Sequence, residues 1–260
     1  MNPFLSIITV NFNNLKGLQL TISNVMGQSF QDFEYIIIDG GSKDGSMDYV
    51  KAQKELIHHW ISEPDKGVYH AMNKGVAAAS GDYLLFLNSG DHFNNPKSLE
   101  KAIPYLGSHD IVYFDLNVVE DHTSTVKTYP DELSFSYFLR DTLPHPASFI
   151  RKKVFSMAGC YNDDLQIVAD WKFFMDAICK FQCSYNHVSV PLSTFYIGGM
   201  SSRPENFLLK MKERQDVINN EYLLFAKDLD SIVELKNKME ILRSSRKINL
   251  LIKLGLINNF

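Results

Sequence analysis

The first 93 residues alternate short apolar runs with segments in which apolar residues recur at helical spacing. The apolar runs, which are typical of buried strands, cover residues 5–10, 33–38, 57–61 and 83–87. The helical spacing covers residues 15–26, 46–54 and 69–79. This order predicts right-handed βαβ crossovers and a mainly parallel sheet flanked by helices, which is an α/β fold.

A polar residue follows each of the four predicted strands at its carboxyl end. These residues are Asn11, Asp39, Asp65 and Asp91. Ligands of open α/β sheets bind at this edge. One such residue is ordinary turn chemistry, because Asn and Asp form turns readily. Four of them along one edge of one sheet predict a binding crevice there.

The strand predicted at residues 83–87 is followed by Asn88-Ser89-Gly90-Asp91. A rigid strand therefore delivers the carboxylate of Asp91 to the mouth of the predicted crevice. A hard divalent cation that holds a diphosphate takes such an oxygen ligand. The alternative is a turn in which these side chains only donate and accept local hydrogen bonds.

The second half of the chain has a less regular pattern. We expect helices at residues 96–106, 133–140 and 170–181, a strand at 110–115, and a more exposed strand region at 116–129. Residues 184–190 and 192–196 read as two paired strands around Pro191. From residue 205 onward the chain is mostly helical and charged, which predicts a C-terminal helical extension.

Composition excludes several classes of protein. The 260 residues carry a formal net charge of -4 with a pI near 6.1, so the chain gives no global reason to expect nucleic-acid binding. The three cysteines, Cys160, Cys179 and Cys183, are expected to be reduced thiols rather than a disulfide or zinc set. Neither a signal peptide nor a spanning apolar run is recognised, so we expect a cytoplasmic protein.

Four segments of the sequence, in the same order along the chain, resemble motifs of family 2 glycosyltransferases with the GT-A fold. They are SIITVNFN at 6–13, IIDGGSKDGS at 37–46, SEPDKGVYHAMNKG at 62–75 and GDYLLFLNSGD at 81–91. Shorter matches are His145-Pro, Ala169-Asp-Trp171 and Gly198-Gly-Met-Ser201. The resemblance implies a Rossmann-like GT-A domain at 1–203, with a nucleotide-binding half at about 1–115, an acceptor half at about 116–203, and an extension at 204–260.

The resemblance is to bacterial enzymes of surface-polysaccharide assembly, of the colanic-acid or O-antigen kind. It implies transfer of a sugar, with inversion, from a nucleotide-sugar, in first place a UDP-sugar, to a glycan or lipid-linked acceptor. The residues that it assigns to the nucleotide are Thr9, Asn11, Asp39, Asp65, Asn73, Lys74, Asn88 and Ser89. Asp39 also has a physical case, because a carboxylate suits the N–H donor of uracil or guanine. Its alternative role is to cap the glycine-rich turn that follows. The alternatives for the other two are structural: Asp65 as a turn residue and Lys74 as a solvated helix residue.

The resemblance also implies a Mg²⁺ or Mn²⁺ site and a general base. The family's acidic metal motif is reduced here to Asp91, because Asn88 and Gly90 stand where carboxylates are usual. Asp170 matches the family's base, which takes the proton of the acceptor hydroxyl. The alternative for Asp170 is an N-cap of the helix that follows it.

Further contacts to the acceptor or to phosphate are expected from His145, Trp171, Ser201 and Arg203. A structural histidine and a core tryptophan are the alternatives for the first two. Two other functions stay open at this stage: a catalytically degenerate scaffold that binds nucleotide-sugars, and a sugar nucleotidyltransferase. The second lacks support, since residues 11–14 contain neither glycine nor lysine.

The last 23 residues, 238–260, form a basic segment with interleaved aliphatic residues. Such a segment can lie on the inner face of the plasma membrane as a peripheral contact. The alternative is that it packs on the domain or on a second subunit of a homodimer.

Overall fold

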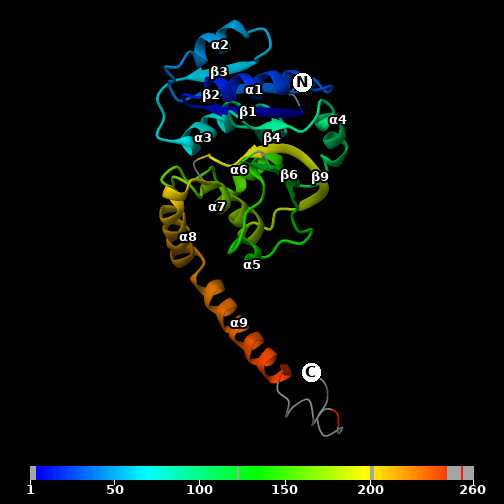
Figure 1. The fold of residues 1–260 in the computed structure, drawn as a ribbon, viewed down its shortest axis with the longest axis vertical. Helices are drawn as coiled ribbons and strands as arrows, with labels where there is room; N and C mark the ends of the chain where they lie inside the picture. The colour runs from blue at the N-terminus through cyan, green and yellow to red at the C-terminus, as the bar shows by residue number, and fades with distance from the viewer. Residues whose placement is uncertain (1–3, 122, 200–201, 245–252, 254–260) are drawn as a thin grey trace. The chain divides into compact units, whose positions relative to one another are not determined.

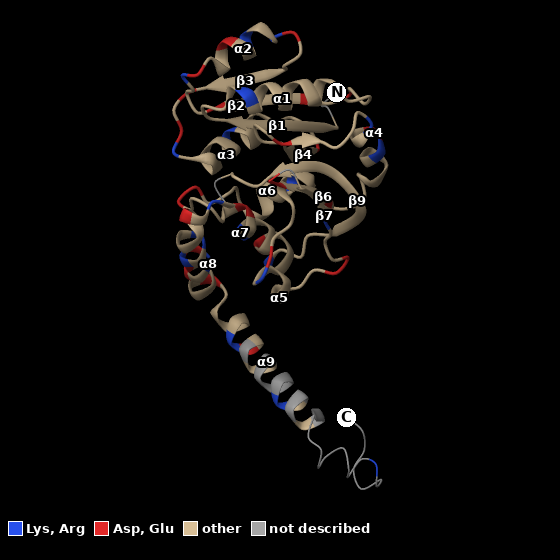
Figure 2. Ribbon diagram, viewed as in Figure 1, with Lys and Arg blue, Asp and Glu red and all other residues tan. Residues whose placement is uncertain are grey.

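The computed structural model describes residues 4–121, 123–199, 202–244 and 253 (Figure 1). The chain divides into two compact units, Met1–Glu213 and Arg214–Phe260. The first unit holds one large sheet with its covering helices, and the second is helical where it is described. Acidic and basic positions are interspersed along the ribbon rather than gathered in blocks of one sign (Figure 2).

The first half of the sheet is parallel, as the sequence predicts. Its strands lie in the order β3 (His59–Ser62), β2 (Glu34–Asp39), β1 (Leu5–Asn11) and β4 (Tyr83–Phe86). The connecting helices are α1 (Leu15–Met26), α2 (Ser46–Ala52) and α3 (Val68–Ala78). All residues of β1 and β4 are buried, because helices cover both faces of a parallel sheet. The predicted α/β fold is confirmed.

The second half continues the same sheet with mixed strand directions. Beyond β4 come β8 (Ser148–Arg151), β6 (Ile111–Glu120), β9 (Tyr185–Tyr196) and β5 (His92–Phe93), while β7 (Thr123–Lys127) pairs with β6. The β4–β8, β8–β6, β6–β7 and β9–β5 pairs are antiparallel, and the β6–β9 pair is parallel. The parallel part of the sheet lies within residues 1–115, the range for which the sequence predicts nucleotide binding.

Several boundaries differ from the sequence-based expectation. The two strands expected around Pro191 are wrong: they are the single strand β9, whose register against β6 shifts next to the Asp115–Pro191 pair. Proline has no backbone N–H for the ladder, so a bulge there is the expected result. The helix expected at 96–106 is α4 (Ser98–Ala102) followed by the 3₁₀ turn η1 (Ile103–Tyr105), which contains Pro104.

The remaining helices of this half are short. They are α5 (Phe135–Phe138), the 3₁₀ turn η2 (His145–Ala147), α6 (Lys152–Ala158), α7 (Ala169–Met175) and the π-helical turn η3 (Asp176–Lys180). Helix α6 was not predicted from the sequence. The amphipathic helix expected at 170–181 is α7 together with η3.

Two glycines, Gly75 and Gly81, allow neighbouring segments to pack closely against β1. A Cβ at Gly75 in α3 would lie 2.6 Å from Ile8 Cγ2, so glycine lets this helix approach β1. A Cβ at Gly81 would lie 2.6 Å from the backbone nitrogen of Ser6. Both contacts hold β1 and β4 in the positions from which their carboxyl ends reach the site.

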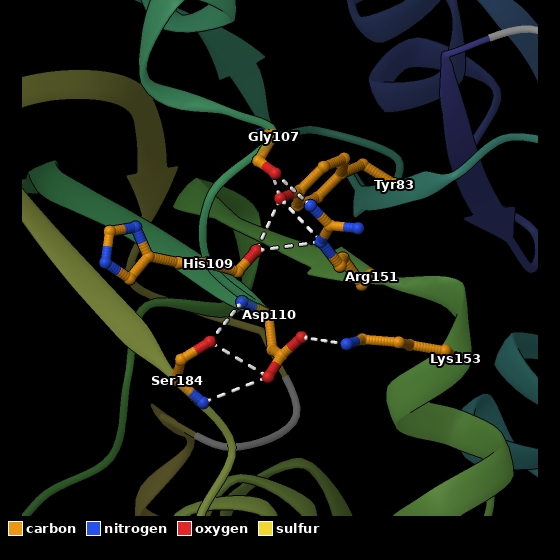
Figure 3. Close-up of polar contacts among 7 residues, drawn as sticks. All are labelled: Tyr83, Gly107, His109, Asp110, Arg151, Lys153 and Ser184. Atoms are coloured by element: carbon orange, nitrogen blue, oxygen red, sulfur yellow. Dashed lines mark hydrogen bonds and ion pairs between the residues drawn. The ribbon is translucent and has the colours of Figure 1, made fainter.

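A polar cluster joins the strands at the opposite, amino edge (Figure 3). Arg151 Nε donates to the hydroxyl of Tyr83 at 3.0 Å and to the carbonyl of His109 at 3.1 Å, and the guanidinium lies over the Tyr83 ring. Beside it, the Asp110 carboxylate accepts from Ser184 and forms an ion pair of 2.7 Å with Lys153. The cluster thus links the starts of β4, β6 and β9 with the end of β8.

The helices η5 (Pro204–Asn206), α8 (Phe207–Glu221) and α9 (Leu223–Ser244) follow. All three cysteines are free thiols, as expected. Among the described residues, no helix is both long enough and apolar enough to cross a bilayer.

Candidate active site

A cavity of about 910 Å³ opens at the carboxyl edge of the parallel strands. Its walls come from the segment after β1, the start of α1, the loop after β4, the start of α7, and the segment after β9. Of the residues predicted for the site, it is lined by Asn88, Ser89, Asp91, His145, Asp170 and Arg203. Chain segments as far apart as Phe12 and Arg203 therefore meet in one cavity.

Asp91 reaches this cavity from the loop after β4. Thr21 Oγ1 fixes the loop, because it donates to the Asp91 carbonyl oxygen at 2.8 Å and accepts from the Gly90 N–H at 3.0 Å. Within the described part of the chain no side chain donates to the Asp91 carboxylate. Burial raises the pKa of this carboxyl from its ordinary 3.8 to about 7.

Asn88 supplies a second oxygen near Asp91. Its Oδ1 is buried and has no hydrogen-bond partner among the described residues, although the residue lines the cavity. A buried polar atom without a partner is costly unless a ligand satisfies it. An amide oxygen and a carboxylate on one loop fit a Mg²⁺ or Mn²⁺ ion that takes its other ligands from phosphates and water. In the described ranges no group of three or more His, Cys, Asp or Glu side chains could hold a metal.

Asn11 and Asp39 form a buried network behind the cavity. Asn11 Nδ2 donates to Asp39 Oδ1 at 2.8 Å, and Ser89 Oγ donates to Asn11 Oδ1 at 2.8 Å. Asp39 also accepts from the backbone N–H of Gly41 and of Ser42 and from two serine hydroxyls. Burial alone would raise the pKa of Asp39, but the hydrogen bonds from Ser42, Asn11 and Ser62 together lower it. Asp39 therefore caps the turn after β2, which was its alternative role.

Thr9 and Asp65 do not line the cavity. Thr9 is buried in β1, where its hydroxyl donates to the Leu87 carbonyl at 2.8 Å and bonds the Tyr35 hydroxyl at 3.0 Å. Asp65 Oδ1 accepts from the Gly67 N–H at 3.0 Å, and a Cβ at Gly40 would lie 2.8 Å from Asp65 Oδ2. The Asp65 side chain thus packs closely against Gly40 in the turn after β2.

Asn73 and Lys74, which were expected on the diphosphate side, do not line the cavity. The Asn73 side chain bonds the carbonyl of Tyr161 at 2.8 Å and the N–H of Tyr161 at 3.0 Å, so its polar atoms are occupied away from the cavity. Lys74 forms an ion pair of 2.9 Å with Glu63 and does not line the cavity. Their positions on α3 point both side chains elsewhere.

Asp170 lies in the first turn of α7 and lines the cavity. Its Oδ1 accepts a hydrogen bond of 2.8 Å from the Tyr69 hydroxyl. The N-cap of α7 is Val168, so the alternative role of Asp170 as the N-cap is wrong. Tyr69, which sequence reasoning missed as a site residue, lies 101 positions earlier in the chain.

His145 lies in η2, at the wall of the cavity. Its Nε2 shares a hydrogen bond of 2.8 Å with the Tyr161 hydroxyl, and its ring stacks on Phe86 with centroids 4.9 Å apart. Burial lowers the pKa of His145, and the charge of Asp170 only partly opposes this effect. The imidazole is therefore neutral near pH 7, which suits a hydroxyl partner better than a phosphate.

Trp171, which was expected to contact an acceptor, does not line the cavity. The indole is 2% exposed and its Nε1 donates to the Phe138 carbonyl at 2.6 Å. The helical turn that directs Asp170 to the cavity directs its neighbour into the core. Arg203 does line the cavity, and its Nε donates to the Gly198 carbonyl at 3.1 Å. Ser201 lies outside the described residues.

Other lining residues were not predicted from the sequence. Phe12 is 65% exposed at the cavity wall, and Lys16 and Tyr196 also line it. A large exposed aromatic side chain beside Asn11 was a usable signal, since such side chains are usually buried. Nothing local in the sequence distinguishes Lys16 from a solvated helix residue.

Comparison with known proteins decides the family of this site. The family model "Glycosyl transferase family 2" matches residues 6–159, more than half of the chain. The chain belongs to glycosyl transferase family 2. The match covers β1 to α6, which includes the loop with Asn88 and Asp91 and stops before Asp170.

Relatives extend the similarity further along the chain. This glycosyltransferase is 37% identical over 185 residues to an uncharacterized glycosyltransferase of Mycobacterium tuberculosis, covering 68% of this chain and 71% of the relative. It is 32% identical over 180 residues to a PGL/p-HBAD biosynthesis glycosyltransferase of Mycobacterium bovis, covering 66% and 68%.

Solved structures share the fold. Staphylococcus aureus TarS 1–349 in complex with UDP-GlcNAc aligns with a TM-score of 0.65 at 19% identity, over 85% of this chain and 67% of that chain. The match to the longer TarS structure spans 40% of that chain. The mannosyltransferase PcManGT of Pyrobaculum calidifontis, in complex with GDP-Man and Mn²⁺, aligns with a TM-score of 0.57 at 15% identity over 78% and 59%. The GT-A fold expected from the sequence is confirmed.

Proposed function

We propose that this glycosyltransferase moves a sugar, with inversion, from a nucleotide-sugar to a hydroxyl of a glycan or lipid-linked acceptor. The observation that supports it best is that Asp91 and Asp170, from different elements, line the same cavity. One carboxylate is suited to hold a cation on the departing diphosphate, and the other is suited to take the proton of the attacking hydroxyl. Inversion needs this division of roles, because the nucleophile attacks on the face opposite the leaving group.

The nucleotide-sugar would enter along the carboxyl edge of the parallel strands. Phe12 offers an exposed ring to a base next to the turn that Asp39 caps. Arg203 offers a guanidinium to phosphate oxygens, which it can bind through two N–H groups. We favour a UDP-linked donor, since the TarS neighbour was solved with UDP-GlcNAc. A GDP-linked donor is the alternative to test, because PcManGT was solved with GDP-Man.

Asp91 and Asn88 would hold the divalent cation, since both line the cavity and the Asn88 Oδ1 has no partner among the described residues. When bound, the cation stabilises negative charge on the departing diphosphate. Asp170 accepts the proton of the acceptor hydroxyl as that oxygen attacks the anomeric carbon. His145, being neutral, hydrogen-bonds the acceptor and keeps its hydroxyl oriented.

The acceptor is proposed to belong to cell-surface glycan or glycolipid assembly. The Mycobacterium bovis relative is named for PGL/p-HBAD biosynthesis, which supports a glycolipid setting for a similar enzyme. A location at the inner face of the plasma membrane, which the basic C-terminal segment predicts, would bring this enzyme to such an acceptor.

The proposal is tested by donor hydrolysis, in which water replaces the acceptor. The protein is incubated with UDP- and GDP-sugars in Mn²⁺, in Mg²⁺ and in chelator, and the released sugar is followed by proton NMR. We expect hydrolysis that requires the cation and that yields first the anomer opposite to that of the donor. Release of the same anomer would contradict inversion, and nucleotide binding without any hydrolysis would favour the scaffold alternative.

Asp170→Asn provides the mechanistic test. The amide cannot accept the proton, so turnover should fall by roughly a hundredfold or more while donor binding is little changed. Asp91→Asn should instead remove the dependence on the cation together with most turnover, because it deletes the carboxylate ligand of the metal. Wild-type turnover in the Asp170→Asn protein would rule out Asp170 as the base.

A further inference from the structure

The carboxylate of Asp170 is held by a side chain from a distant part of the chain. Tyr69 is 6% exposed in α3, and its hydroxyl lies 2.8 Å from Asp170 Oδ1 and 2.7 Å from the Ile167 carbonyl oxygen. A hydroxyl has one proton, so it donates to one of these oxygens at a time. Two acceptors for one donor is an arrangement that a purely structural hydrogen bond does not need.

The two acceptors match the two protonation states of a general base. While Asp170 is ionised, the Tyr69 O–H donates to its carboxylate. Once Asp170 has taken a proton, that O–H turns to the Ile167 carbonyl, and the Tyr69 oxygen accepts from the new Asp170 O–H. A backbone N–H in this position could only donate and a carbonyl could only accept, whereas the hydroxyl of Tyr69 can do either.

The Tyr69 hydroxyl keeps its own proton throughout. Burial raises the pKa of Tyr69 well above its ordinary 10.0, and the neighbouring charge of Asp170 adds to this effect. Tyr69 is therefore a positioning residue that exchanges hydrogen-bond partners, rather than an acid or a base.

The Ile167 peptide is in turn fixed by a buried carboxylate. Glu213 of α8 accepts from the Gln166 N–H at 2.7 Å through Oε1 and from the Ile167 N–H at 3.0 Å through Oε2. Glu213 is buried, and a carboxylate that accepts from two adjacent backbone N–H groups holds the segment firmly. The carbonyl that Tyr69 needs as its second acceptor belongs to this same residue, Ile167.

We propose that Tyr69, with Ile167 anchored by Glu213, holds Asp170 in position in both its ionised and its protonated state. This inference rests on the proposed function, in which Asp170 is the base. It also extends the catalytic unit into α8, beyond residue 203, where the resemblance in sequence ends. The proton that Asp170 takes comes from the acceptor hydroxyl and returns to solvent before the next turnover, while Tyr69 only exchanges hydrogen-bond partners.

The test is a double-mutant cycle on donor hydrolysis, with the UDP- or GDP-sugar that the wild-type protein hydrolyses fastest. Tyr69→Phe removes only the hydroxyl, and kcat should fall between about tenfold and a hundredfold at unchanged donor KM. In the Asp170→Asn background the same change should cost nothing more, because the group it positions is already gone. Glu213→Gln should lower kcat in the same direction but less, since its amide oxygen can still accept one bond.

Matched controls separate positioning from stability. Tyr113→Phe also deletes a buried tyrosine hydroxyl that donates to a backbone carbonyl, that of Pro130, but Tyr113 does not line the cavity. Glu205→Gln neutralises an exposed carboxylate in η5. Both controls should keep wild-type kcat. If circular dichroism shows that Tyr69→Phe does not fold, 3-fluorotyrosine at position 69 replaces it, because it keeps the shape of tyrosine. Its hydroxyl is a stronger hydrogen-bond donor, which makes the Asp170 carboxylate a weaker base. We therefore expect a lower kcat in the fluorinated protein.

The outcomes are distinct. An active Asp170→Asn protein, or a wild-type protein that hydrolyses neither class of donor, overturns the proposed function and this inference with it. An inactive Asp170→Asn protein beside a Tyr69→Phe protein with wild-type kcat overturns the inference alone. Equal losses from Tyr69→Phe in both backgrounds also overturn it, because they would show that Tyr69 acts independently of Asp170. Unchanged turnover with 3-fluorotyrosine has the same meaning.

Discussion

At the scale of single residues, the buried carboxylates Asp39 and Asp91 differ in how many hydrogen bonds they accept. Asp39 accepts hydrogen bonds from several donors and its pKa is lowered, whereas burial raises the pKa of Asp91 to about 7. A well-satisfied carboxylate shapes a turn, and a poorly satisfied one is ready for a cation. Perturbed groups in a cavity are for this reason candidates for function.

Asp91 predicts an unusual dependence of stability on pH in chelated protein. Its folded pKa, about 7, exceeds its ordinary 3.8, so the folded state holds the proton that the unfolded state has lost between these values. Wild-type stability from this group is highest below pH 4, falls as pH rises to 7, and then stays low. Asp91→Asn removes the titration, so relative to wild type it should gain stability from pH 4 to 7, on the order of a few kcal/mol in total.

The measurement is urea unfolding of both proteins in chelator at pH 4.5, 6 and 8. A difference in unfolding free energy that does not change with pH would show that Asp91 ionises freely in the folded state. Saturating Mn²⁺ should narrow the difference at pH 8, because the cation stabilises the ionised wild-type carboxylate.

The residues that sequence reasoning placed well are those whose position follows from a strand end. Asn88, Ser89 and Asp91 come directly after β4, and the carboxyl edge of a parallel strand is read from the sequence alone. Asn73 and Trp171 lie away from the cavity wall, because the rotation of a helix decides which way each of its side chains points. Tyr69 and Glu213 were missed because their partners lie 101 and 46 positions away.

At the scale of elements, the two halves of the sheet differ in how far the sequence predicts them. The parallel half follows from alternating strand and helix periods, which are local signals. The mixed half depends on pairings between distant strands, such as β4 with β8 and β6 with β9. No local pattern encodes those pairings, and Pro191 led the sequence-based prediction to divide β9 into two strands.

The amino-edge cluster (Figure 3) predicts a change in stability without a change in chemistry. Arg151→Met removes the hydrogen bonds of its guanidinium to Tyr83 and His109 and its contact with the Tyr83 ring. Loss of charged hydrogen bonds at this partly buried position should lower the unfolding free energy by about 2 kcal/mol or more. Donor hydrolysis per folded molecule should be unchanged, because the cluster lies at the edge opposite the cavity.

Lys153→Met is the matched control for that prediction. Its ion pair with Asp110 involves a lysine side chain that is 57% exposed, so it should contribute at most about 1 kcal/mol. Equal losses of stability in the two variants would show that Arg151 does not join the strands in the way we describe. Reduced kcat in Arg151→Met would show that the two edges of the sheet are coupled.

At the scale of the whole molecule, we propose that the cavity carries out the chemistry and that the C-terminal segment determines the location of the protein. The cavity lies within the unit Met1–Glu213, which accounts for every lining residue. The segment at 238–260 adds only a predicted surface contact, and its residues 245–252 and 254–260 lie outside the described structure. Truncation of the C-terminal segment should therefore separate membrane binding from catalysis.

The prediction for the segment follows from its charge. It contains five cations against one acidic residue, Glu240, in a chain whose net charge is -4; the cations are Lys238, Arg243, Arg246, Lys247 and Lys253. Each cation near an anionic membrane contributes about 1 kcal/mol, and salt screens this attraction. The protein should sediment with anionic liposomes at low salt and less at high salt. Deletion of residues 244–260 should abolish sedimentation and leave donor hydrolysis intact, because α8 with Glu213 is retained. If the segment instead packs on the protein, liposome binding will be absent, and the truncated chain will lose stability or change its oligomeric state in light scattering.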